Sequence, residues 1–186
     1  QVVREIDALG GAQGMVTDAA SIQFRMLNAA KGPAVWSPRS QCDKVCYQRA
    51  MKLVLERQPG LAVKQAMVKC FIVENGKLCG VETDFGDKFL AKAVVVSTGT
   101  FLSGKLHYGM SSFPGGRAGD PPSVSLSEAL SEQLGIRLGR LKTGTPPRIL
   151  AKTIDFSKME FQAADECEEQ FSHFALPDYL PLAQKR

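Results

Sequence analysis

Hydrophobic positions recur at helical spacing along the first third of the chain. Val3–Leu9 is a short amphipathic run that stops at Gly10, and a second helical pattern covers Val16–Leu27. Ser37 offers an N-cap and is followed by proline, which is favoured in the first turn of a helix. The apolar stripe behind this signal predicts a long helix over Pro38–Arg57.

The apolar spacing then changes to that of strands. Val68–Glu74 and Lys77–Thr83 flank an Asn-Gly pair, the strongest short-range signal for a hairpin, and Lys88–Ala91 follows as a third strand. Together they predict a small antiparallel β-meander. Ala93–Ser97 begins with four consecutive apolar residues, which is typical of a central strand covered on both faces. We therefore expect a buried parallel strand after the meander.

The second half of the chain adds one helix and one strand to these predictions. Ser125 and Glu128 have the spacing of a capping box, which predicts a helix through Leu134 that Gly135 ends. Ile136–Leu141 has the composition of a further strand. The alternation of helices with buried strands assigns the chain to the α/β class.

Composition excludes several classes of protein. The 186 residues are 44% hydrophobic and 23% charged, as in an ordinary globular domain. No apolar run approaches the ~20 residues that cross a bilayer, and no basic-then-apolar leader opens the chain, so a cytoplasmic location is expected. The first residue is Gln1 and not Met, which indicates a segment of a longer protein.

Charge is unevenly distributed. The formal net charge is +4, but Asp155–His173 holds six acidic residues and one lysine, so the rest of the chain carries +9. This basic remainder fits an anionic partner, and an ordinary solvated surface is the alternative. Cys42 and Cys46 are four residues apart and could form half of a metal site, although their place on an apolar stripe favours core packing. No metal site is expected.

The small-residue stretch after the predicted buried strand allows three interpretations. Gly99–Lys105 matches the first seven positions of a phosphate loop, but Leu106 stands where a hydroxyl must hold magnesium, which disfavours nucleotide hydrolysis. The stretch would otherwise lie at the carboxyl edge of the sheet, where α/β folds bind ligands, or be a simple strand end. The candidate cofactor-binding residues there are Thr98, Gly99 and Thr100.

A basic stripe follows the last predicted helix. Clustered Arg and Lys on one element supply salt-dependent affinity for RNA phosphates. The spacing of the stripe does not keep to one strand face, so a solvated or domain-interface face is an equal alternative. Its members are Arg137, Arg140, Lys142 and Arg148.

Five motifs, in order along the chain, resemble the MnmG (GidA) family of flavoproteins, which modify the wobble uridine of certain transfer RNAs. The resemblance implies FAD reduced by NADH, methylenetetrahydrofolate as one-carbon donor, and a homodimer that works with the GTPase MnmE. The product would carry a carboxymethylaminomethyl-type group on carbon 5 of uridine. The motifs are Val3–Gly11, Leu27–Val35, Thr98–Leu102, Gly115–Ser123 and Gly139–Arg148.

The resemblance also assigns individual residues. By position, Val68 and Ser123 correspond to family contacts with FAD. Arg117 would lie near the negatively charged reduced flavin, or instead form an ion pair with Asp120. The family's catalytic cysteines lie in motifs outside these residues, so no catalytic residue is expected in the chain.

The family fold sets the expected domains. It is a two-dinucleotide-binding, glutathione-reductase-like flavoprotein, so residues 1–135 are expected to be a partial FAD-binding domain without its first strand and its G-x-G-x-x-G turn. Residues 136–186 would be the truncated start of an inserted domain. The isolated chain should then bind FAD weakly or not at all. The alternatives are a folate-dependent uridine methyltransferase of transfer RNA and a non-catalytic RNA-binding module.

Overall fold

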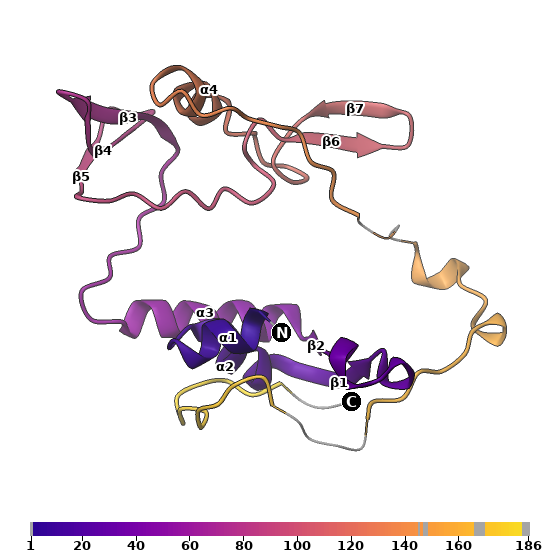
Figure 1. Cartoon of the computed structure of the whole chain (residues 1–186). Coiled ribbons are helices and arrows are strands. Elements are labelled where there is room, and N and C mark those ends of the chain that lie inside the picture. Colours follow the sequence, from indigo (N-terminus) through magenta and orange to yellow (C-terminus); the bar gives the residue numbers. More distant parts are fainter. Residues whose placement is uncertain (1, 145, 147–148, 166–169, 184–186) are drawn as a thin grey trace. The chain divides into compact units, whose positions relative to one another are not determined.

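The computed structural model describes residues 2–144, 146, 149–165 and 170–183, and it divides into two compact units. Unit 1 combines residues 1–63 with 149–186, and unit 2 is residues 64–148. These bounds differ from those of the two domains expected from the sequence, whose assignment stays a prediction. Figure 1 shows the elements of both units.

In its described residues, unit 1 contains three α-helices and a two-stranded ribbon. Strands β1 and β2 pair antiparallel, with Phe24 opposite Ser40. A small apolar core joins α2 to α3 and to Leu180 near the other end of the chain. The elements, in chain order, are α1 (Val2–Ala8), α2 (Ala12–Ala20), β1 (Ser21–Leu27), β2 (Ser37–Cys42) and α3 (Lys44–Arg57), with 3₁₀ turns at Ala29–Lys31, Pro33–Val35, Ala151–Thr153 and Phe156–Lys158.

The opening helix of unit 1 is confirmed, but two other helix predictions are wrong in part. The second helix ends at Ala20, where the chain becomes β1, and the residues expected to begin the long helix form β2. Pairing between β1 and β2 satisfies the backbone groups that a helix would otherwise bond, and the Ser40 hydroxyl donates to that of Ser21 at 2.8 Å. The true N-cap of α3 is Asp43, whose carboxylate accepts from the Cys46 amide at 2.8 Å.

Unit 2 contains the β-meander, which is confirmed. Strands β3 (Val68–Glu74), β4 (Lys77–Thr83) and β5 (Lys88–Leu90) form an antiparallel sheet in that order. Asn75 and Gly76 have φ of 50° and 72°, as a type I′ turn requires. The connection therefore has the tight hairpin geometry that the Asn-Gly pair predicts.

Helix α4 (Val124–Glu132) covers the meander. It packs against β3, and the shared core contains Phe71 with Leu126, Ala129 and Leu130. The helix is confirmed, but its predicted capping box is wrong, because Ser123 stands at the N-cap. The helix ends at Glu132, two residues before the predicted end at Leu134, and Gly135 follows with φ of 65°.

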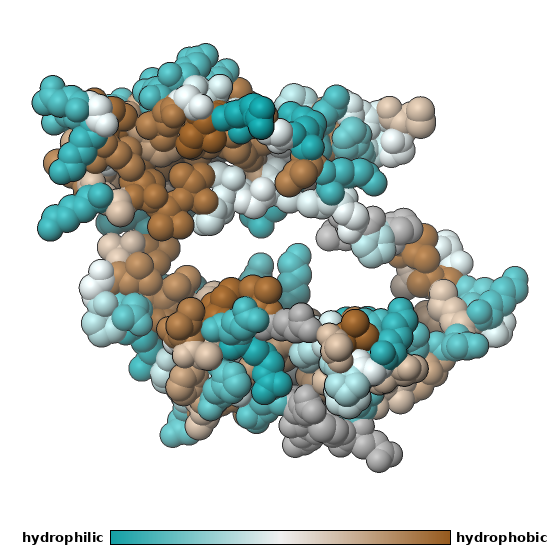
Figure 2. Space-filling model, in the orientation of Figure 1, coloured by the Kyte–Doolittle hydropathy of each residue, from teal (hydrophilic) through white to brown (hydrophobic). Residues whose placement is uncertain are grey.

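Two strand predictions in unit 2 are wrong. Residues 93–97 form no strand, and the Val95 side chain is 90% exposed; only Val94 packs against the core. A central strand needs hydrogen-bonded neighbours on both sides, and the described residues supply none. Residues 136–141 likewise form no strand. Figure 2 shows the apolar surface that both units leave exposed.

A second hairpin in unit 2 has no counterpart in the predictions. Strands β6 (Lys105–Tyr108) and β7 (Ser111–Pro114) pair antiparallel, and the rings of Tyr108 and Phe113 stack across them with centroids 5.4 Å apart.

Among the described residues, no helix has the length and apolar character that spanning a membrane requires.

Candidate functional site: a loop cluster in unit 2

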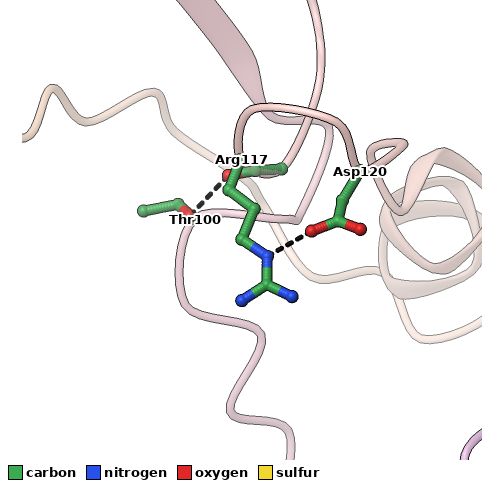
Figure 3. Close-up of polar contacts among 4 residues, drawn as sticks. Thr100, Arg117 and Asp120 are labelled. Atoms are coloured by element: carbon green, nitrogen blue, oxygen red, sulfur yellow. Dashed lines mark hydrogen bonds and ion pairs between the residues drawn. The ribbon is translucent and has the colours of Figure 1, made fainter. Parts of the chain in front are cut away.

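A tight turn begins the loop in which the candidate cofactor residues lie. The Phe101 amide donates to the Thr98 carbonyl at 3.1 Å, and Gly99 within this turn has φ of 56°. The Thr100 hydroxyl donates to the Gly116 carbonyl at 2.7 Å, as Figure 3 shows. Thr100 therefore ties the turn to the glycine-rich segment that follows β7.

Ser123 joins this loop to the start of α4. Its amide donates to the Phe101 carbonyl at 2.8 Å, and its carbonyl accepts from the Ser103 amide at 3.0 Å. Leu102 and Ser123 thus form a parallel bridge, with Ser123 buried at the N-cap of the helix. We call residues 98–104 and 115–123 together the loop cluster.

Close packing inside the loop cluster explains two of its glycines. A Cβ on Gly116 would overlap the Phe101 ring, and one on Gly104 would overlap the carbonyl groups of Gly115 and Thr100. The chain itself therefore fills the space beside these glycines. At Gly99, by contrast, a Cβ would meet no atom within 4 Å, so its backbone is open on that side.

Arg117 and Asp120 form the ion pair that the sequence allowed as an alternative role. They close a turn in which the Asp120 amide donates to the Arg117 carbonyl at 3.0 Å, and the Arg117 Nε contacts the Asp120 carboxylate (Figure 3). The Arg117 side chain remains 72% exposed. Pairing with Asp120 fixes its direction without removing it from solvent.

The structure brings five of the six candidate FAD residues into the loop cluster. Thr98, Gly99 and Thr100 lie on its first segment, and Arg117 and Ser123 lie on its second. Val68 stands at the start of β3 and packs against the apolar core of unit 2, as Leu102 of the loop cluster also does. The role of all six toward a flavin stays a prediction.

The basic stripe does not lie on a common element. Arg137, Arg140 and Lys142 follow α4 in an exposed stretch without strand structure, and Arg148 lies outside the described residues. The Arg140 guanidinium donates from both terminal nitrogens to the Ser103 carbonyl, at 3.3 Å each. One member of the stripe is therefore bonded to the loop cluster, while RNA contact by the stripe stays a prediction.

Sequence reasoning missed the contacts around Ser103. This residue has φ of 43°, and its hydroxyl bonds with that of Ser127 on α4. A left-handed conformation is uncommon for serine, and a bond across 24 residues leaves no periodic pattern. The Ser-Gly dipeptide, a common turn pair, is the one local signal that points to this position.

Unit 1 holds two carboxylates that accept hydrogen bonds from distant amides and that no motif predicts; Asp7 is fully buried and Asp18 is half-buried. Asp18 accepts from the amides of Phe171 and Ser172 at 2.9 and 2.8 Å, and Asp7 accepts from the His173 amide at 2.7 Å. Burial raises the pKa of Asp18 above its ordinary value, and the two amide bonds only partly oppose this shift. These carboxylates fix a distant segment of the chain to α1 and α2.

A cavity of about 290 Å³ lies in unit 1. It contains none of the predicted cofactor residues, and Arg57 at its wall lies 4.5 Å from the centroid of the Tyr179 ring. Its walls include Asp7, Met15, Val54, Arg57, Phe174 and Tyr179.

Cys42 and Cys46 are both half-buried; Cys42 ends β2 and Cys46 lies on α3, so the predicted helix does not carry both. The Cys46 thiol donates to the Pro181 carbonyl at 3.3 Å, and burial raises its pKa above the ordinary value. The described residues contain no group of three or more potential metal ligands.

Comparison with known proteins relates the chain to one family throughout. It is 56% identical over 172 residues to the "tRNA uridine 5-carboxymethylaminomethyl modification enzyme MnmG" of Thermodesulfovibrio yellowstonii, covering 92% of this chain and 27% of that protein. The protein of the same name from Protochlamydia amoebophila is 54% identical over 164 residues, covering 88% of this chain and 26% of that protein. The chain thus spans about a quarter of the length of these curated relatives.

Solved structures give the same relationship. Two crystal forms of GidA from Aquifex aeolicus match with a TM-score of 0.84 and 48% identity, covering 94% of this chain and 29% of theirs. The profile of the family described as glucose inhibited division protein A matches residues 1–179. A match of this extent establishes that the chain belongs to the GidA family.

Proposed function

We propose that the protein acts in the modification of the wobble uridine of transfer RNA, and that this chain supplies part of its FAD pocket. The observation that carries the proposal is the 56% identity to a protein named as a tRNA uridine 5-carboxymethylaminomethyl modification enzyme. At this identity over nearly the whole chain, a shared substrate class is the simplest interpretation. NADH, methylenetetrahydrofolate, the GTPase MnmE, a homodimer and a cytoplasmic location belong to the same proposal.

The loop cluster supports the cofactor part of the proposal. The backbone at Gly99 is open, so a flat ring system could approach it closely, and the neighbouring Thr98 side chain is only half-buried. Ser123, buried at the N-cap of α4, would bind the cofactor near the positive end of the helix dipole. Bound FAD would supply the redox chemistry of the reaction.

Arg117 is the charged residue of this proposed pocket. The Asp120 carboxylate holds the direction of the Arg117 guanidinium. A fixed positive charge beside a flavin favours the anionic reduced form, because it stabilises negative charge on the ring system. Arg117 would therefore orient and stabilise the reduced cofactor, without taking part in bond making.

A hybrid protein tests the function. In it, this chain replaces the matching segment of the Thermodesulfovibrio yellowstonii MnmG, and the unmodified relative serves as the control. We expect the hybrid to bind FAD and to produce the same modified uridine, identified by mass spectrometry of digested transfer RNA. A 5-methyluridine product would instead support the methyltransferase alternative.

The RNA-binding alternative has its own signature in the same experiment. A folded hybrid that binds transfer RNA with steep salt dependence, yet binds no flavin and leaves uridine unmodified, would support a non-catalytic module. That result would contradict the proposed function.

A further inference from the structure

Ser103, at the end of the first segment of the loop cluster, has an uncommon backbone conformation. Its φ of 43° lies in the left-handed region, which residues with a side chain adopt rarely. Such a conformation persists where the surrounding contacts determine it. Ser103 is therefore a position whose neighbours must hold the backbone in place.

Every polar group of Ser103 has a partner. Its amide donates to the Ser123 carbonyl at 3.0 Å, and its hydroxyl bonds with that of Ser127. Because the Ser127 hydroxyl donates its one proton to the Val124 carbonyl at 2.8 Å, the Ser103 hydroxyl must be the donor of this pair. The Ser103 carbonyl accepts from both terminal nitrogens of Arg140.

Arg140 is the member of this group that comes from outside the loop cluster and α4. It lies in the exposed stretch beyond α4, 37 residues from Ser103. Among the hydrogen bonds and ion pairs of the described residues, none involves the neighbouring basic residues Arg137 and Lys142. Arg140 therefore differs from Arg137 and Lys142 in its hydrogen bonds, although all three side chains are basic.

We propose that Arg140 is a positioning residue that holds the turn from Thr98 to Ser103 in place. Two donors of one rigid guanidinium converge on a single carbonyl, which an ammonium group cannot reproduce. The turn so held contains Gly99, whose open backbone is the proposed approach of the flavin. The effect on flavin rests on the proposed function, whereas the effect on the turn does not.

Amide hydrogen exchange on the 186-residue chain tests the effect on the turn. We expect Arg140→Ala to accelerate exchange of the Ser103, Gly104 and Ser123 amides about tenfold, since these amides make the hydrogen bonds of the cluster. Arg140→Lys should give an intermediate rate. Arg137→Ala, at an exposed position three residues away, is the matched control and should leave the rates unchanged. Equal rates in the Arg140→Ala variant and the unsubstituted chain would overturn the proposal.

Flavin and RNA titrations of the hybrid protein test the consequence. Arg140→Ala should weaken FAD binding about tenfold and shift the flavin absorbance bands, while Arg137→Ala does neither. Equal weakening of transfer RNA binding by both substitutions, with FAD affinity unchanged, would identify Arg140 as a phosphate contact and overturn the proposal. If the unsubstituted hybrid binds no flavin, the proposed function fails, and amide exchange alone decides whether Arg140 positions the turn.

Discussion

The two units close their long-range contacts by different chemistry. In unit 1, the carboxylates of Asp7 and Asp18 accept hydrogen bonds from three successive amides more than 150 residues away. In unit 2, the loop cluster closes through backbone bonds and through glycines that leave room for a ring or a carbonyl. The long-range contacts of unit 1 therefore include carboxylate acceptors, whereas the loop cluster of unit 2 needs glycines at its closest approaches as well as its hydrogen bonds.

This difference predicts different vulnerabilities. A carboxylate acceptor matters because its removal leaves amides without partners, and because its charge depends on pH. A glycine at a close approach matters because any added Cβ must displace its neighbour. Substitutions that separate these two causes will show whether the comparison holds.

The largest effect is expected in unit 1. Asp18→Ala removes the partner of the Phe171 and Ser172 amides and should lower the free energy of unfolding by about 1–3 kcal/mol for each amide left unpaired. Urea denaturation measures the loss. Asp155→Ala, which removes an exposed carboxylate bonded to Ser157, is the control and should cost far less. A loss no greater than that of the control would contradict the anchoring role of Asp18.

A single added methyl group should disturb unit 2. Gly116→Ala places a Cβ against the Phe101 ring, and overpacking of this kind costs about 1–3 kcal/mol. Gly139→Ala is the matched control, because a Cβ there meets no atom within 4 Å. If the two variants unfolded at the same urea concentration, the claim that close packing at Gly116 requires glycine would be contradicted.

A smaller loss is expected in the meander. Gly76→Ala forces a side chain into a position with φ of 72°, which should cost about 1–2 kcal/mol. Space is open around Gly76, so this loss reports backbone conformation alone and separates it from the steric effect at Gly116. Unchanged stability, measured by urea denaturation, would mean that the β3–β4 turn does not keep its type I′ geometry.

The smallest effect is the pH dependence of unit 1. Because burial raises the folded-state pKa of Asp18, the folded chain binds a proton there more tightly than the unfolded chain does. Stability from this group should therefore decrease as pH rises from the unfolded value of about 3.8 through the folded pKa. Titration of the Asp18 carboxyl by NMR measures that pKa, and a value at or below 3.8 would contradict the prediction.

Local signals predicted the parts of the fold whose partners are near in sequence. The Asn-Gly turn predicts the β3–β4 hairpin, although bulges shift its register farther along the strands, and Gly10 and Gly135 follow the ends of helices as glycine commonly does. The Ser-Pro pair, taken as a helix start, instead forms the first two residues of β2, because pairing with β1 satisfies the same backbone groups. The apolar run at residues 93–97 failed because burial of a strand requires neighbours that the described chain does not provide.

The sequence predicts which residues belong to the candidate site, but it does not predict how these residues contact one another. Small residues at Thr98–Thr100 and at Ser123 were identified from pattern and resemblance, and the structure joins them through Phe101 and Gly116. The contacts of Ser103 with Ser127 and Arg140 could not be predicted, because each depends on a three-dimensional approach without periodicity. Arg140 was identified for its charge, whereas its observed contact is with a backbone carbonyl.

The central claim is that the open backbone at Gly99 receives the flavin, and FAD titration of the hybrid protein tests it most directly. Gly99→Ala adds a methyl group at φ of 56°, and Gly109→Ala, at φ of 59° in the β6–β7 turn, imposes nearly the same backbone strain. We predict that Gly99→Ala weakens FAD binding at least tenfold and that Gly109→Ala leaves it unchanged. Equal FAD affinity in the two variants would contradict the claim.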